Sequence, residues 1–162
     1  MDNILDTRDL NKRLDELEEQ LNDLDTNIMD ISDELEEMEE ELESFKLNNL
    51  EDKFIKESIG IKTLELEKAK EELEEFKQSN EFEELEELKE LESEIPQWID
   101  GNQLINEDHF IDYCKDLIKD IGDLPKNIPS YIVIDWESTA ENLKVDYSEI
   151  DYQGETWFYR IY

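Results

Sequence analysis

An uninterrupted heptad pattern of apolar residues constrains the fold of this chain more than any other feature. The apolar positions alternate steps of four and three residues without a slip, and they are Leu10, Leu14, Leu17, Leu21, Leu24, Ile28, Ile31, Leu35, Met38, Leu42 and Phe45. Apolar residues at this spacing form one stripe of an α-helix and are typical of a coiled-coil seam. The pattern predicts a coiled-coil helix of roughly 54 Å, at ~1.5 Å per residue.

A second helical stretch follows the first. The segment "KLNNLED", residues 46–52, breaks the heptad pattern, and its two asparagines suit a helix end and a turn. Beyond it, Gly60 is a weak point of the expected helix. The apolar stripe of this helix is shorter, and it is formed by Leu64, Leu66, Ala69, Leu73 and Phe76.

The charges of the two helices favour pairing them with each other. Residues 1–45 carry eighteen acids and three bases, whereas residues 46–80 carry nine acids and seven bases. A copy of the first helix would bring acidic flanking positions such as Glu34, Glu39 and Glu41 close to their equivalents, and like charges repel there. We therefore expect an antiparallel coiled-coil hairpin. Self-association through this coil, as a parallel dimer, is the alternative, and the hairpin could also form a homodimer at its tip or through the rest of the chain.

The chain changes character after residue 80. The acidic helix "EFEELEELKELESE" ends at Pro96, and a region rich in Trp and Tyr follows. We expect a helix that begins near Asn106 or Asp108 and ends at Gly122, a shorter helix that begins at Asp135, and a terminal β-hairpin around Gln153 and Gly154. The aromatic side chains should form the core of this region, namely Trp98, Trp136, Tyr147, Tyr152, Trp157, Phe158 and Tyr159.

The predicted fold class is mainly α, with a long antiparallel coiled-coil hairpin over residues 1–80 and a small acidic α+β domain over residues 81–162. This C-terminal segment holds twenty-two acids and six bases, so both parts are strongly negative. The formal charge of the whole chain is −33, far beyond the magnitude of roughly 2–8 that keeps a small domain soluble. Such an excess costs self-repulsion and calls for a function.

The charge also restricts the binding partners. Nucleic acid and anionic lipid require clustered Lys and Arg, and the sequence has no such cluster. We expect a basic protein partner and no direct contact with nucleic acid or membrane. Cys114 is the single cysteine and no apolar run approaches ~20 residues, so a cytoplasmic location is expected.

The sequence offers no catalytic constellation. His109 is the single histidine, glycine-rich phosphate loops are absent, and Cys114 lies on the apolar side of its helix. Residues 23–34 approach the ligand spacing of a calcium loop, but Ile28 occupies the position that requires glycine. We therefore expect no enzyme activity, no cofactor and no metal site.

Two motifs of the C-terminal half resemble a known family. A helix of the form F-x-x-Y-x-x-x-L-x-x-x-x-G precedes "I-D-[YW]-x-x-x-A-x-x-L", and the matching residues are Phe110, Tyr113, Leu117, Gly122, Ile134, Asp135, Trp136, Ala140 and Leu143. Together with "GETWFYRI", this half of the chain is similar to the carboxy-terminal part of the ArdA-type antirestriction proteins and related small phage proteins. The amino-terminal domains of that family are replaced here by the coiled coil.

The resemblance implies a function. The family is similar to double-stranded DNA in shape and charge and inhibits restriction enzymes by occupying their nucleic-acid channel. Carried over to this chain, the resemblance gives a role as phosphate mimics to acidic residues of the C-terminal segment, namely Glu83, Glu84, Glu86, Glu87, Glu90, Asp112, Asp116 and Asp120.

The charge density of the first helix is in keeping with DNA mimicry. Eighteen carboxylates over 45 residues correspond to about one per 3.8 Å of helix axis, close to the ~3.4 Å between phosphates of one DNA strand. The candidate residues here are Glu34, Glu36, Glu37, Glu40 and Glu41. We expect a phage or mobile-element inhibitor, an antirestriction or anti-CRISPR protein. The alternative is an oligomerising coiled-coil adaptor or spacer whose C-terminal domain binds a protein partner.

Overall fold

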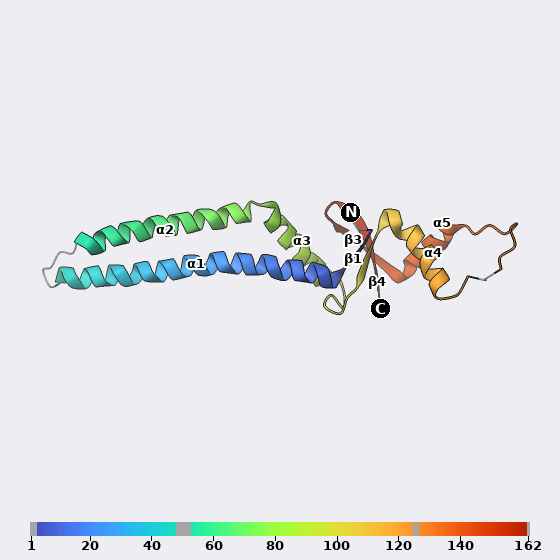
Figure 1. Ribbon diagram of the computed structural model, residues 1–162, viewed down its shortest axis with the longest axis horizontal. Helices are drawn as coiled ribbons and strands as arrows, with labels where there is room; N and C mark the ends of the chain where they lie inside the picture. The colour runs from blue at the N-terminus through green and yellow to red at the C-terminus, as the bar shows by residue number, and fades with distance from the viewer. Residues whose placement is uncertain (1–2, 48–52, 125–126, 162) are drawn as a thin grey trace. The chain divides into compact units, whose positions relative to one another are not determined.

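The computed structural model describes residues 3–47, 53–124 and 127–161, and Figure 1 shows the order of its elements. The chain divides into two compact units. We call Asp15–Leu85 the hairpin unit, and Met1–Leu14 together with Glu86–Tyr162 the sheet unit. The predicted fold class, a helical hairpin with a small α+β part, is confirmed.

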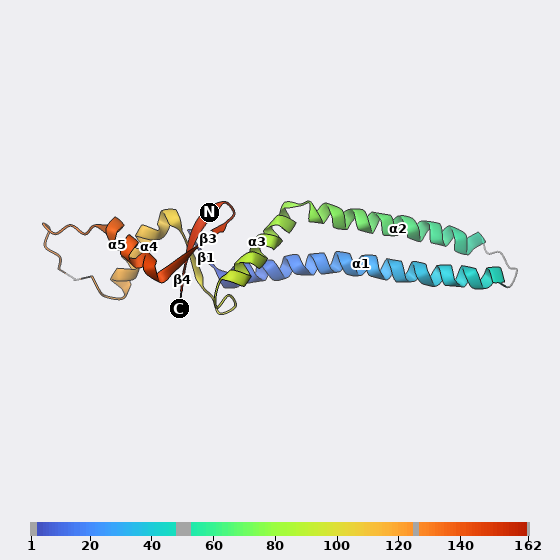
Figure 2. The same ribbon diagram turned by 180° about the vertical axis from the view of Figure 1, so that it is seen from behind.

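The hairpin unit consists mainly of two long helices, α1 (Thr7–Leu47) and α2 (Lys53–Lys77), which lie side by side in Figure 1 and in the reverse view of Figure 2. The predicted turn at residues 48–52 lies outside the described residues. Between Asp15 and Lys46, the heptad positions of α1 are buried or half-buried and the intervening positions are exposed. The heptad pattern therefore predicted the contact face of α1 correctly.

The contact face of α2 differs from the predicted stripe at one position. Leu64 is 66% exposed, whereas Lys62, two residues earlier, is half-buried. Apart from the half-buried Ser58, the less exposed positions of α2 follow heptad spacing and are Ile55, Ile59, Lys62, Leu66, Ala69, Leu73 and Phe76. Lys62 keeps its place in this row because its ammonium group binds Glu34 of α1 at 2.7 Å and Glu65 at 2.9 Å. A charged group partnered in this way is tolerated at a seam position and fixes the register of the pair.

The third helix, α3 (Asn80–Glu94), is separated from α2 by a cap at Ser79. The Phe82 N–H donates to Ser79 Oγ at 3.3 Å, and the same hydroxyl donates to the Phe76 carbonyl at 2.7 Å. This pattern satisfies free backbone groups at the start of a helix. The acidic helix before Pro96 is thus present, with its own N-terminus.

The sheet unit is built on four antiparallel strands in the order β1-β2-β4-β3. These are β1 (Ile4–Asp6), β2 (Gln103–Asn106), β3 (Tyr147–Tyr152) and β4 (Glu155–Arg160). The predicted terminal hairpin is confirmed: β3 and β4 flank Gln153 and Gly154, whose φ angles of +53° and +74° suit a two-residue turn. Neither β1 nor β2 was predicted.

Two of the predicted capping residues, Asn106 and Asp135, accept backbone hydrogen bonds at the start of helical segments. Asn106 accepts the Asp108 N–H and begins a short 3₁₀ turn, η1 (Glu107–His109), which leads into α4 (Phe110–Asp120). Gly122, with φ +81°, ends α4 in a left-handed conformation. Asp135 accepts the Ser138 N–H at 3.0 Å and begins α5 (Trp136–Leu143), which another 3₁₀ turn, η2 (Lys144–Asp146), joins to β3.

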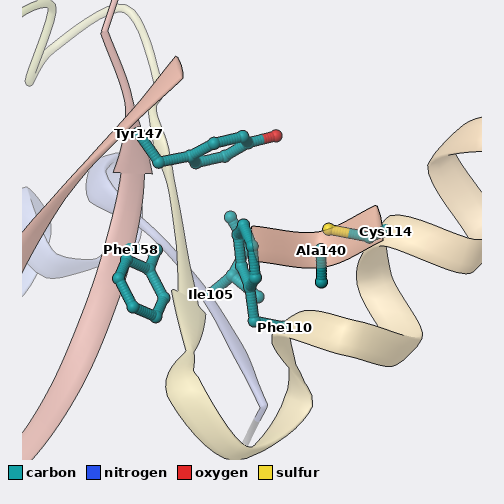
Figure 3. Packing of buried hydrophobic residues seen from close by; sticks show 6 residues of the cluster. All are labelled: Ile105, Phe110, Cys114, Ala140, Tyr147 and Phe158. Carbon is teal, nitrogen blue, oxygen red and sulfur yellow. The ribbon is translucent and has the colours of Figure 1, made fainter. Parts of the chain in front are cut away.

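Phe110 lies at the centre of the core between the sheet, α4 and α5. Its ring lies 4.8 Å from that of Phe158 and 5.1 Å from that of Tyr147, and Ile105, Cys114 and Ala140 complete the cluster shown in Figure 3. Six of the seven aromatic residues predicted for the core are buried, and Trp136 is half-buried. Within the described ranges, no helix is both long enough and apolar enough to cross a membrane.

Candidate functional site: carboxylate surfaces of the two units

The outward side of α1 in the hairpin unit carries a row of carboxylates. Helical spacing places one set of exposed acids along a single line, namely Glu19, Asp23, Asp30, Glu37 and Glu41. Between residues 15 and 47 this helix has fifteen acids and a single lysine, Lys46. The carboxylates are therefore held at fixed intervals on a regular backbone with little local neutralisation.

Three of the predicted phosphate-mimic residues of α1 meet in one shallow depression. Glu36, Glu37 and Glu40 line it together with Asp33, and it has a volume of about 240 Å³. All four side chains are exposed. Because they stand on adjacent helical turns, a cation placed in the depression would meet several carboxylates at once.

Glu34, also predicted to mimic a phosphate, forms an ion pair within the hairpin. Its carboxylate accepts the Lys62 ammonium group across the hairpin, and this contact raises the pKa of Lys62 above its ordinary value. Part of the negative charge of Glu34 is therefore compensated within the chain. Glu34 is less suited to bind a partner than Glu36, Glu37 or Glu40.

The predicted aspartates of α4 are also partly neutralised. Asp112 binds Lys115 at 2.7 Å, which holds the pKa of Asp112 below its ordinary value, and Asp116 binds Lys119 at 2.8 Å, which raises the pKa of Lys119. Both are exposed pairs between residues three apart in sequence. Such pairs are weak and open readily, so these aspartates lose only part of their attraction for a basic partner.

The predicted acids of α3 fall into both units. Glu83 is exposed and Glu84 half-buried in the hairpin unit, whereas Glu86, Glu87 and Glu90 are exposed in the sheet unit. Glu86 forms a loose pair with Lys89 at 3.8 Å. Of these predicted residues, Glu90 occupies a concave site.

That site is a cleft of about 500 Å³ in the sheet unit, which we call the acidic cleft. Carboxylates reach it from α3, η1 and β3, and they belong to Glu90, Glu94, Glu107, Glu149 and Asp151. Among the residues that the structure describes, none of the five forms an ion pair with a basic side chain of the chain. Five exposed carboxylates around one cleft make a strongly negative local potential.

The cleft is not lined by charge alone. Leu91 and Ile150, both almost fully buried, contribute apolar surface, and Thr156 donates a hydrogen bond to Asp151 at 3.0 Å. A lysine or arginine side chain has a matching construction, with an aliphatic stem and a cationic head. The acidic cleft is therefore chemically suited to an inserted basic side chain.

Sequence reasoning missed four of the five cleft carboxylates, namely Glu94, Glu107, Glu149 and Asp151. They come together because α3 and the β3–β4 hairpin, more than fifty residues apart in sequence, line the same cleft. The one local signal was the alternation of Glu149 and Asp151 with Ile150, since residues two apart in a strand share a face.

Basic residues gather in another part of the sheet unit. Arg8 and Arg160 line a polar depression of about 190 Å³, and Asp6 accepts hydrogen bonds there from the Arg8 backbone N–H and from Arg8 Nε, both at 2.9 Å. These bonds lower the pKa of Asp6 to about 2. Asp6 belongs to β1, so this pair holds the first strand next to the first turn of α1.

Asp6→Asn should remove stability that depends on pH. A carboxyl group whose pKa is lowered on folding stabilises the fold above its ordinary value of 3.8, and this contribution is lost as the pH falls towards about 2. We expect Asp6→Asn to lower the free energy of unfolding by about 1 kcal/mol at neutral pH, after allowance for solvent screening, and by progressively less below pH 4. Urea unfolding followed by tryptophan fluorescence measures this directly.

Asp9→Asn is the matched control for Asp6→Asn. It removes an exposed pair with Lys12, at 2.6 Å, in the same region. Its effect on the free energy of unfolding should be small. Equal pH profiles for the two variants would contradict the role assigned to Asp6.

Comparisons with known proteins do not identify the chain: no protein-family model matches it, and no curated protein or solved structure is significantly similar to it.

Proposed function

We propose that the protein is a phage or mobile-element inhibitor that mimics the charge of DNA and occludes the nucleic-acid channel of a host defence enzyme. A restriction enzyme is the first candidate target and a CRISPR effector the second. In this mechanism carboxylates take the places of phosphates in a cationic channel. The inhibitor would act in the host cytoplasm, without catalysis and without a cofactor.

The carboxylate row on α1 carries this proposal. Asp23, Asp30 and Glu37 follow one another at intervals of seven residues, about 10.5 Å at ~1.5 Å per residue, and the other acids of α1 fill the space between them. A regular helix keeps these intervals fixed, so little ordering is required when a rigid cationic channel binds. Fast association and strong salt dependence follow from such charge complementarity.

The acidic cleft adds a feature that a uniform row of carboxylates lacks. A guanidinium or ammonium group inserted there would face carboxylates from three elements while its stem contacts Leu91 and Ile150. Charge-assisted hydrogen bonds of this kind are stronger than neutral ones and depend on direction. The cleft would therefore contribute specificity for a particular basic side chain of the target.

A second candidate function has one observation in its favour. Tyr131 and Val133, in the segment before α5, are 84% and 89% exposed, and Ile132 between them is 51% exposed. Consecutive exposed apolar side chains are typical of a protein-binding segment. They support an adaptor whose hairpin is a spacer and whose C-terminal part binds a protein.

A nuclease-protection assay separates the two functions. The purified full chain is added to a restriction enzyme or a CRISPR nuclease with its DNA substrate, and cleavage is measured over a range of salt concentrations. A DNA mimic should compete with DNA, and its inhibition should weaken as salt rises. Cleavage that stays unchanged by an excess of the protein at low salt, across a panel of such enzymes, would overturn the DNA-mimic proposal.

Charge-neutralising variants then locate the inhibitory surface. Replacing Glu36, Glu37, Glu40 and Glu41 by Gln should weaken inhibition by roughly tenfold or more and reduce its salt dependence, because four channel contacts are lost. The matched control changes the same number of charges on the other helix, in Glu67, Glu71, Glu74 and Glu75, and should have a much smaller effect. Equal effects would mean that net charge alone matters. Neutralising the cleft residues Glu94, Glu107, Glu149 and Asp151 tests the sheet unit in the same way.

A further inference from the structure

The second helix of the hairpin has an apolar row that α1 does not cover. Phe54, Ile61 and Leu64 are 76%, 61% and 66% exposed. Counting 100° per residue, they lie roughly 120° from the row that faces α1. Their steps of seven and three residues are those of a heptad seam. Single exposed apolar residues are common, but three at heptad spacing in so polar a helix indicate a second contact face.

The first contact face is itself incompletely buried. The heptad positions of α1 from Leu21 to Phe45 are half-buried, although they face α2. Two paired helices leave the flanks of such a seam partly open to solvent, and in helix bundles further helices cover those flanks. Both observations point to additional helical surface packed against the hairpin.

The charges of the two helices indicate which helical surface packs against the hairpin. From Lys53 to Lys77, α2 carries six lysines and seven glutamates, whereas residues 15–47 of α1 carry fifteen acids and one lysine. Two α1 helices placed together would repel, but two α2 helices would not. We propose that the hairpin unit associates with a second copy of itself through α2, around a twofold axis that relates antiparallel α2 helices.

The antiparallel arrangement pairs the exposed residues of α2 in one register. When Ile61 lies across Leu64 of the second copy, Leu64 lies across Ile61 of that copy, so two apolar layers form around the axis. The same register puts Glu57 across Lys68 and Lys53 across Glu72 of the other helix. Within one chain these residues already form the exposed pairs Lys53–Glu57, at 3.7 Å, and Lys68–Glu72, at 3.3 Å.

This arrangement gives each of these four charged residues an oppositely charged neighbour on the other helix. The contact is isologous, since each copy offers the same patch, and it closes at two copies. Only two apolar layers are formed, so the dimer should dissociate on dilution. The carboxylate row of α1 is not used, and a dimer would present two such rows.

Sedimentation equilibrium of the full chain over a wide range of concentrations tests the dimer. We expect the mass to rise from that of one chain towards that of two. Ile61→Glu should abolish this rise, because it brings like charges to the axis. Met29→Glu is the matched control, since Met29 is 59% exposed on α1, and it should dimerise like the unchanged protein. A single-chain mass at every concentration, or a dimer unaffected by Ile61→Glu, would overturn the proposal.

Cysteine pairing and charge exchange test the register. Under mild oxidation, a mixture of Ile61→Cys and Leu64→Cys proteins should cross-link more than either protein alone, while the native Cys114 is fully buried. Lys68→Glu should weaken the dimer, and adding Glu57→Lys to it should restore association because the pair is then reversed. Cross-linking that is no greater in the mixture, or failure of the double variant to recover, would overturn the antiparallel register. Circular dichroism confirms that each variant remains helical.

Discussion

Phe110→Ala should lower the free energy of unfolding of the sheet unit by about 3–5 kcal/mol, the usual cost of truncating a fully buried phenylalanine. Phe110 is 1% exposed. Its ring contacts those of Phe158 and Tyr147 and also lies 6.2 Å from that of Tyr113, so three neighbouring aromatic rings lose contacts or rearrange. The cavity would lie in the core cluster between the sheet and α4.

Tryptophan fluorescence makes this measurement specific to the sheet unit. All three tryptophans, Trp98, Trp136 and Trp157, belong to that unit. When unfolding is followed by tryptophan emission, the midpoint of the transition should move to a much lower urea concentration in Phe110→Ala. Far-UV circular dichroism, to which the long helices contribute strongly, follows the unfolding of the hairpin unit separately. Val145→Ala is the control, since Val145 is 79% exposed and its truncation should change stability by less than about 0.5 kcal/mol. Similar shifts for the two variants would contradict the central place of Phe110.

The sequence predicted those parts of the fold that depend on local periodicity and capping. The heptad seam of α1, the caps at Asn106 and Asp135, and the turn at Gln153 and Gly154 each result from residues close together in the chain. The short strand β1 does not. It pairs with β2, with Ile4 opposite Ile105. A strand of three residues is too short to show the alternation of apolar and polar residues that predicts a strand. Such pairing depends on the closure of the intervening chain and cannot be read from either segment alone.

One position of the contact face of α2 and four of the five carboxylates of the acidic cleft were missed for a related reason. Leu64 is the more apolar choice for a seam, yet Lys62 occupies it because Glu34, on a different helix, supplies a partner. The cleft needs Glu94, Glu107 and Glu149 from separate elements, and in a chain with forty-nine acids no local pattern distinguishes them from the others. The predicted phosphate mimics of α1, by contrast, needed only helical spacing, and Glu36, Glu37 and Glu40 do share one depression.

Thr7 ties the N-terminal segment to the chain that follows α3. It is fully buried, its hydroxyl donates to the Trp98 carbonyl at 2.7 Å, and the same oxygen accepts the Asn102 N–H at 2.8 Å. The Thr7 N–H also donates to the Asn102 carbonyl at 3.0 Å. Nearby, the Trp98 indole N–H donates to Asn11 Oδ1 at 2.7 Å, so four hydrogen bonds to Thr7 and Asn11 at the start of α1 hold this segment in place.

Thr7→Val should therefore destabilise the sheet unit by about 2–6 kcal/mol. Valine has nearly the same shape but no hydroxyl, so the Trp98 carbonyl and the Asn102 N–H lose their partner, at about 1–3 kcal/mol for each buried group. Thr7→Ser is the matched control, because it keeps the hydroxyl and loses one methyl group, and it should cost about 1 kcal/mol. Urea unfolding followed by tryptophan fluorescence gives the free energy of unfolding of the unchanged protein and of both variants. If valine were tolerated better than serine, packing of the Thr7 methyl group, and not the hydroxyl bonds, would anchor β1 to the sheet unit.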